Sequence, residues 1–235
     1  MDLRLRSAAC LAALMLTACS PHAFSPPGRT LPLESAAAVG AGNTGVQVEG
    51  GISTEILGPG VVHGTARVRH GVGDHTDLNV EGNFAYYVDG DDQIEAHRGI
   101  YSGRLGIKHA FGEHFALTGG IAAGGSAGGG FLSPDLGFIA GFENPYVVPF
   151  VSGRLVLSQP IAAREVAFVD DGVAFMQAPQ FTYGYAITTG LRIPVGPLAK
   201  PLRPAILVGF GITQIFDGEE DTGFMGGNIG FELTL

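Results

Sequence analysis

The residues with the most enzyme-like spacing are Gly124, Ser126 and Gly128, which form a literal G-x-S-x-G motif. In a nucleophile elbow this motif follows a strand and opens a helix, and the fold brings in a histidine and an acid. Two further glycines follow Gly128 instead, so a helix cannot start easily and a flexible outer loop is the favoured interpretation. His63, near the end of a predicted strand, is another candidate catalytic residue, but no serine stands at a spacing that would place it beside His63 on the same face of the strand. We therefore predict that the protein is not an enzyme and has no catalytic residue.

Metal and cofactor motifs are absent from the sequence: it contains no H-E-x-x-H, C-x-x-C or Walker motif, so we predict no cofactor and no dedicated metal site. Acidic side chains do cluster in predicted loops, and hard carboxylate oxygens suit calcium or magnesium. One hypothesis is that these loops bind divalent cations loosely and bridge to lipopolysaccharide phosphates; the alternative is that they only keep the loops solvated. Their negative field argues against nucleic acid as a partner. The candidate residues are Asp89, Asp91, Asp92, Asp217, Glu219, Glu220 and Asp221.

The start of the chain has the form of a targeting segment. A basic beginning and a short apolar stretch, Ala8–Leu16, precede the sequence Leu-Thr-Ala-Cys that ends at Cys19. This ending resembles a bacterial lipobox, which implies that residues 1–18 are a lipoprotein signal peptide and that Cys19 is acylated and anchors the protein to the outer membrane of a Gram-negative cell. An ordinary signal peptide with a chance cysteine is the alternative.

The segment after Cys19 is rich in proline and glycine. Pro26, Pro27 and Pro32 lack the amide hydrogen that a strand ladder needs, so we predict that residues 19–43 are a lipidated N-terminus followed by a periplasmic linker. Residues 44–235 then form one all-β domain.

That domain has the pattern of an antiparallel up-and-down barrel. Glycine accounts for 38 of 235 residues, and charged residues for 15% against a usual figure of about 25%. Ten segments, with eight as the smaller possibility, alternate between apolar and polar residues with a period of two. The predicted strands are Thr44–Ile56, Val61–His70, Thr76–Val88, Arg98–Ala110, Phe115–Gly124, Ser133–Glu143, Tyr146–Ser158, Phe181–Ile193, Ala205–Phe216 and a last strand that ends at Leu235.

The polar side of the alternation carries a balanced set of charges, which suits neighbouring ion pairs in a confined lumen with the apolar side facing lipid. The predicted lumenal charges are Glu49, Glu55, Arg67, Arg69, Asp77, Glu81, Arg98, Arg104, Lys108, Asp135, Glu143, Arg154, Arg192 and Glu232. Outward aromatic residues are predicted to form two girdles, with Tyr86, Tyr101, Phe181, Phe216 and Phe224 near the loops and Phe115, Phe142 and Tyr146 near the turns.

The C-terminal strand resembles the assembly signal of outer-membrane barrels, because Asn228, Gly230, Leu233 and Leu235 fill its polar, glycine and apolar positions. The domain as a whole is similar to the small barrels of the OmpA, OmpX and OmpW kind. This resemblance implies a transmembrane β-barrel, contact with outer-membrane lipid and lipopolysaccharide, insertion by the barrel-assembly machinery and a monomeric state.

Three functions remain open from the sequence. The leading one is a non-enzymatic barrel with a charged, largely filled lumen, which has a structural role or interacts through its surface loops. A narrow, porin-like pore for small solutes is the first alternative. Anionic solutes would suit it, since Arg98, Arg104 and Lys108 follow one strand beside Arg67 and Arg69 and could form an anion-favouring track. A soluble periplasmic barrel lipoprotein that binds an apolar ligand is the second. The long connection Gln159–Gln180 is a candidate for a plug, and whether Ser20–Asn43 enters the lumen is undecided.

Overall fold

The computed structural model describes residues 24–55, 60–88, 99–170, 173–195, 202–219 and 221–235, with the backbone alone described for 55, 167–170 and 173–175. Among the described residues, no helix has the length and apolar character needed to cross a membrane. The strands are β1 (Thr44–Glu55), β2 (Gly60–Gly73), β3 (Thr76–Tyr87), β4 (Gly99–Phe111), β5 (Phe115–Ser126), β6 (Gly129–Gly141), β7 (Val148–Ala163), β8 (Val166–Asp170), β9 (Val173–Gln177), β10 (Thr182–Pro194), β11 (Arg203–Phe216) and β12 (Asp221–Thr234).

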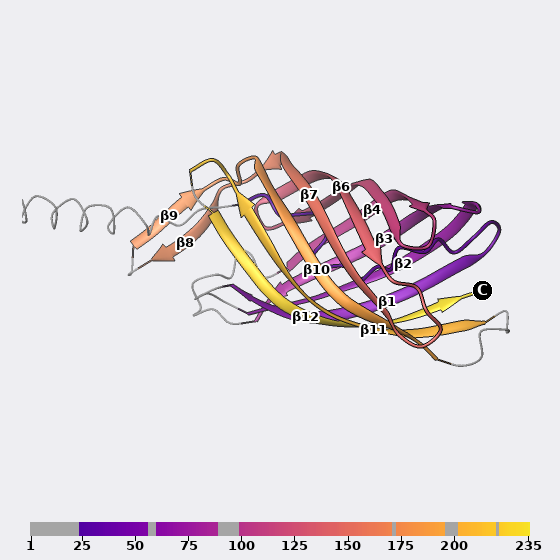
Figure 1. Cartoon of the computed structure of the whole chain (residues 1–235). Helices are drawn as coiled ribbons and strands as arrows, with labels where there is room; N and C mark the ends of the chain where they lie inside the picture. The colour runs from indigo at the N-terminus through magenta and orange to yellow at the C-terminus, as the bar shows by residue number, and fades with distance from the viewer. Residues whose placement is uncertain (1–23, 56–59, 89–98, 171–172, 196–201, 220) are drawn as a thin grey trace, which may run out of the picture.

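Ten of these strands close into an antiparallel barrel, in the order β1-β12-β11-β10-β7-β6-β5-β4-β3-β2 (Figure 1). The first strand pairs with the last, so the barrel has no open edge. The predicted all-β, ten-stranded up-and-down fold is confirmed. Strands β6 and β7 are longer than predicted: they pair from Gly129 opposite Ala163 onward, because backbone pairing continues where the alternation fades.

The connections between barrel strands lie at two ends. The strand ends at the turn end are those joined by the connections 74–75, 112–114, 142–147 and 195–202, and the strand ends at the loop end are those joined by 56–59, 88–98, 127–128, 164–181 and 217–220. In the turn after β4, Gly112 has a φ of 74°, which is why a glycine stands there. The hairpin β8–β9 projects from the loop end (Figure 1), so its strands do not enter the barrel as the plug that the sequence left open for Gln159–Gln180.

Side chains alternate between a charged interior and an apolar outer surface. Along β4, Arg104 and Lys108 are 2% and 0% exposed, whereas Leu105 and Ile107 are 62% and 47% exposed. A soluble barrel has the reverse arrangement, with apolar residues inside. The structure therefore contradicts the interpretation as a soluble barrel with an apolar ligand.

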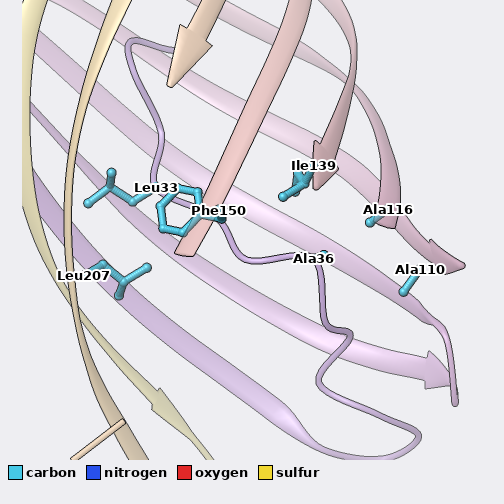
Figure 2. Packing of buried hydrophobic residues seen from close by; sticks show 7 residues of the cluster. All are labelled: Leu33, Ala36, Ala110, Ala116, Ile139, Phe150 and Leu207. Atoms are coloured by element: carbon cyan, nitrogen blue, oxygen red, sulfur yellow. The ribbon is translucent and has the colours of Figure 1, made fainter. Parts of the chain in front are cut away.

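The N-terminal segment lies inside the barrel. Residues 24–43, here called the N-terminal plug, run between the strands as an irregular chain, and Leu33 and Ala36 belong to the buried apolar cluster (Figure 2). The predicted periplasmic linker is thus wrong for the described part of Ser20–Asn43. The error has a physical reason: an extended, proline-containing chain lacks the hydrogen-bonding pattern of a strand, and its burial depends on partners that are far away in sequence.

Candidate functional site in the barrel interior

The backbone of the N-terminal plug is hydrogen-bonded by side chains of the surrounding strands. Gln47 Nε2 on β1 donates to the Leu33 carbonyl (2.8 Å), while the Leu33 amide donates to Glu49 Oε2 (2.9 Å). Lys108 Nζ on β4 donates to the Ala37 carbonyl (2.5 Å). A buried backbone without secondary structure needs such partners, since unpaired groups are costly. The inward polar residues of the wall therefore supply hydrogen-bond partners to the plug backbone at Leu33 and Ala37.

Nearer the loop end, serine and threonine hydroxyls take over this role. Ser133 Oγ on β6 accepts from the Gly28 amide (3.0 Å), and Ser102 Oγ on β4 donates to the Gly28 carbonyl (2.7 Å). Ser158 Oγ on β7 donates to the Pro26 carbonyl (2.6 Å) and lies 2.9 Å from Ser25 Oγ. The prolines of the plug have no amide hydrogen, so fewer donors require a partner.

Two charged residues of the plug, Arg29 and Glu34, complete a network of ion pairs at the centre of the barrel. Arg29 Nε lies 2.6 Å from Glu81 Oε2 on β3, and Glu34 Oε1 lies 3.4 Å from Arg67 Nη1 on β2. Glu34 Oε2 is also 3.4 Å from Arg154 Nη2 on β7. The plug thus connects strands on different sides of the barrel through Arg29 and Glu34, whose side chains are each 2% exposed.

The wall residues of this central network also pair with one another. Arg67 contacts Glu49 and Glu81 at 3.3 and 3.2 Å. Arg104 contacts Glu81 at 3.0 Å and forms two hydrogen bonds to Asp135, at 2.6 and 2.7 Å. Bidentate pairing of this kind is among the stronger arrangements of charge. The members of the network are Arg29, Glu34, Glu49, Arg67, Glu81, Arg104, Asp135 and Arg154, four cations and four anions.

A second group of charges lies towards the turn end. Glu232 on β12 is paired with Arg69 on β2 and with Arg192 on β10, the latter at 2.9 Å. Lys108 Nζ lies 3.4 Å from Asp77 Oδ2. Glu232 and Asp77 therefore each pair with a cation on a strand that is one or two positions away in the barrel.

Glu143 differs from the other described charges that the sequence assigns to the lumen, because it alone among them makes no ion pair within 4.0 Å. It follows β6 in the turn end, beside a cavity of about 510 Å³ that plug residues Ser35 and Val39 also line. Burial raises the pKa of Glu143, although the nearby Arg192 opposes the shift.

The apolar side of the plug packs against β11. A Cβ on Gly209 would lie 2.5 Å from Leu33 Cδ2, and one on Gly211 would lie 2.7 Å from Leu31 Cδ2. The lack of a side chain at these two glycines therefore leaves room for the plug leucines against the inner face of β11. Leu207 joins the same apolar cluster (Figure 2). This explains why β11 is apolar on both faces: one faces outward and the other faces the plug.

One predicted girdle residue is misplaced. Phe224 lines a small cavity with plug residues Pro26 and Leu31, and its neighbour in the register, Thr213, is buried. It therefore points inward, in step with Gly226 and Asn228 on the same strand. Phe216, another predicted girdle residue, does face outward, where the exposed Tyr183 of β10 stacks on it with ring centroids 5.5 Å apart.

The remaining predicted residues lie in other surroundings. Ser126 ends β5 and leads through a two-residue connection into β6, so no helix follows the motif and the Ser126 hydroxyl accepts only from the nearby Gly128 amide (3.2 Å) among the described residues. Asp217 and Asp221 make local hydrogen bonds, and no group of three metal-binding side chains occurs in the described part of the chain. Cys19, the Glu55 side chain, Asp89, Asp91, Asp92, Arg98 and Glu220 fall outside the described residues.

The chain was compared with known proteins at the level of both sequence and structure. No protein-family model matches it, and no curated protein is significantly similar to it. Among solved structures, the translocator domain of the autotransporter NalP from Neisseria meningitidis has 13% identity and a TM-score of 0.46, covering 82% of this chain and 88% of that chain. The β domain of the Bordetella autotransporter BrkA has 10% identity and a TM-score of 0.44, covering 82% and 98%.

A third solved structure, the N-terminal β-barrel domain of Pseudomonas aeruginosa OprF, has 12% identity and a TM-score of 0.37, covering 80% of this chain and 96% of that chain. At these values the likeness is one of barrel architecture alone. The functional conclusion therefore depends on this chain's own residues.

Arg29 and Glu34 are the site residues that sequence reasoning missed. They stand in a segment without alternation, so nothing local marks them as buried. The signal that could have revealed them lies elsewhere: the inward face of β11 is apolar in an otherwise charged interior, and an apolar face needs an apolar partner.

Proposed function

We propose that the protein is a non-enzymatic outer-membrane β-barrel whose lumen is closed by its own N-terminal plug, and that it has a structural role or acts through its loop-end surface. The observation that carries this proposal is the pairing of plug charges Arg29 and Glu34 with Glu81, Arg67 and Arg154 of the wall. The outward apolar residues of the strands support the location in a membrane, because every backbone group of a closed barrel is paired and only the outer face meets lipid.

The pore alternative is less well supported. The cations that would form its anion track are already neutralised where the structure describes them: Arg104 pairs with Asp135, and Lys108 pairs with Asp77. Arg67 and Arg69 pair with Glu49 and Glu232, respectively. Such a row offers little net positive field to a passing anion.

Planar-bilayer conductance of the refolded protein tests the proposal. We expect no steady open-channel current from the wild type. Leu33→Asp should produce steady channels, because it places an unpaired carboxylate in the apolar cluster beside Glu49 and so expels the plug. Leu202→Asp, the same change at an exposed turn-end residue, should stay closed. Steady, anion-selective current from the wild type would refute the closed barrel.

We also propose that Cys19 is acylated and anchors the protein to the outer membrane. The support is the lipobox-like sequence that precedes it. Metabolic labelling with an alkyne-bearing fatty acid should mark the wild type and leave Cys19→Ala unlabelled; equal labelling of both would exclude this anchor.

A further inference from the structure

The two ends of the N-terminal plug lie at opposite ends of the barrel. At the turn end, the Gly42 amide donates to the Gly71 carbonyl (2.9 Å), and the Gly71 amide donates to the Asn43 carbonyl (3.0 Å). At the loop end, Phe24 forms a bridge with Gln180, and the Ser25 amide donates to Thr182 Oγ1 (2.9 Å). The plug therefore crosses the full height of the barrel.

Contacts between these ends follow in the expected order. Strand β4 runs from the loop end to the turn end, and its Ser102 binds Gly28 while its Lys108 binds Ala37. The reach is sufficient, since residues 24–40 can extend over about 55 Å, whereas a 13-residue strand inclined at about 40° covers about 35 Å. The plug is thus an additional crossing that runs in the direction of β4.

This crossing separates the chain before Phe24 from the C-terminus. Leu235 lies at the turn end, where its carbonyl accepts from the Thr44 amide (3.0 Å). An even number of barrel strands brings the start of β1 and the end of β12 to the same side, and the plug then carries the preceding chain to the other side.

Outer-membrane barrels have short periplasmic turns and longer loops outside the cell. The connections 88–98 and 164–181, the longest in this barrel, are both at the loop end. We propose that the chain before Phe24 leaves the barrel on the outer surface of the cell, so that acyl chains on Cys19 insert into the outer leaflet of the membrane. This inference rests on the proposed outer-membrane location and reverses the periplasmic placement expected from sequence.

The distance from the barrel rim to the membrane allows such an anchor. Four residues lie between Cys19 and Phe24, and the five Cα–Cα steps from one to the other span at most about 18 Å. Phe24 already contacts the wall beside β10 through Gln180. The segment from Phe24 back to Cys19 therefore has to cross only the rim of the barrel for the acyl chains to reach lipid on the loop side. If this segment instead returned to the turn end through the lumen, it would meet the plug.

Surface labelling of tagged, full-length protein in a Gram-negative host tests this topology. One short epitope tag is inserted in three separate variants: between His22 and Ala23, between Asp91 and Asp92 in the connection 88–98, and between Pro145 and Tyr146 in a turn-end connection. Antibody binding is then measured in intact and in permeabilised cells. We expect the first two tags to be labelled equally in both preparations, and the third only after permeabilisation.

The controls separate two kinds of failure. If the tag at His22 behaves like the turn-end tag while the connection 88–98 is labelled in intact cells, the inferred exit at the outer surface is wrong and the barrel proposal stands. If the two control tags behave alike, or with their accessibility exchanged, the proposed outer-membrane barrel with its loops outside is itself refuted.

Discussion

At the scale of single residues, Arg67 is a cation of the interior that pairs with three carboxylates. It contacts Glu34 of the plug and Glu49 and Glu81 of the wall, and its side chain is fully buried. Replacing one partner of a buried ion pair leaves the others uncompensated, at a cost of about 3–5 kcal/mol. We therefore predict that Arg67→Met lowers the free energy of unfolding by about that amount, measured by urea titration of the barrel refolded in lipid vesicles.

Arg164 provides the matched control for this substitution. It is exposed in the connection after β7, where only its backbone amide has a hydrogen bond among the described residues. Arg164→Met should change the free energy of unfolding by less than about 0.5 kcal/mol. Equal effects of the two substitutions would show that Arg67 is not buried among anions.

Glu143 gives a prediction that depends on pH. Its pKa in the folded protein is raised by burial above the ordinary value of 4.5, so folding favours the protonated carboxyl. The stabilising effect of this proton is fully present below pH 4.5 and is lost as pH rises through the folded pKa. Glu143→Gln should therefore raise the urea midpoint at pH 8 relative to wild type, and the difference should shrink at pH 4. A difference that grows towards acid pH would contradict this environment.

At the scale of elements, Gly28 is the glycine of the plug that fits most closely against the wall. A Cβ at this position would lie 2.3 Å from Ala122 Cβ on β5, with Ser133 Cβ next at 3.2 Å. Gly28→Ala should lower the free energy of unfolding by about 1–3 kcal/mol through overpacking. Ala122→Gly removes the opposing methyl, so the double variant should recover most of that loss; additive losses in the double-mutant cycle would mean that the two positions do not touch.

The barrel strands could be predicted from sequence and the plug could not, for reasons visible in particular residues. Arg104 is buried and its neighbour in sequence, Leu105, is exposed, so the period-two alternation in the sequence predicts both the strand and which side chains face inward. Leu31 and Leu33 show no such local pattern, and their burial is decided by Gly209 and Gly211, far along the chain. Likewise, alternation assigns Glu232 of β12 to the interior, but its pairing with Arg69 of β2 depends on barrel closure, because β12 reaches β2 only through its pairing with β1.

At the scale of the whole molecule, closing the barrel and seating the plug depend on the same strands. Gln47 and Glu49 of β1 bind Leu33, and Asn228 of β12 binds the Leu31 carbonyl. These two strands also form the closing pair of the barrel. We infer that the plug is enclosed as β1 and β12 meet, since both strands of the closing pair hydrogen-bond to it.

The most direct test of the plugged barrel is a disulfide between plug and wall. Ser25 Oγ and Ser158 Oγ are 2.9 Å apart, so cysteines at both positions bring two sulfur atoms within bonding reach. In a refolded chain that starts at Ser20 and lacks the native cysteines, oxidised Ser25→Cys/Ser158→Cys should migrate as an internally cross-linked monomer after denaturation. Ser25→Cys/Ser152→Cys, about 20 Å further along the same face of β7, should not cross-link. Absence of the bond in the first pair, with both thiols free and the barrel folded, would contradict a lumen filled by the N-terminal plug.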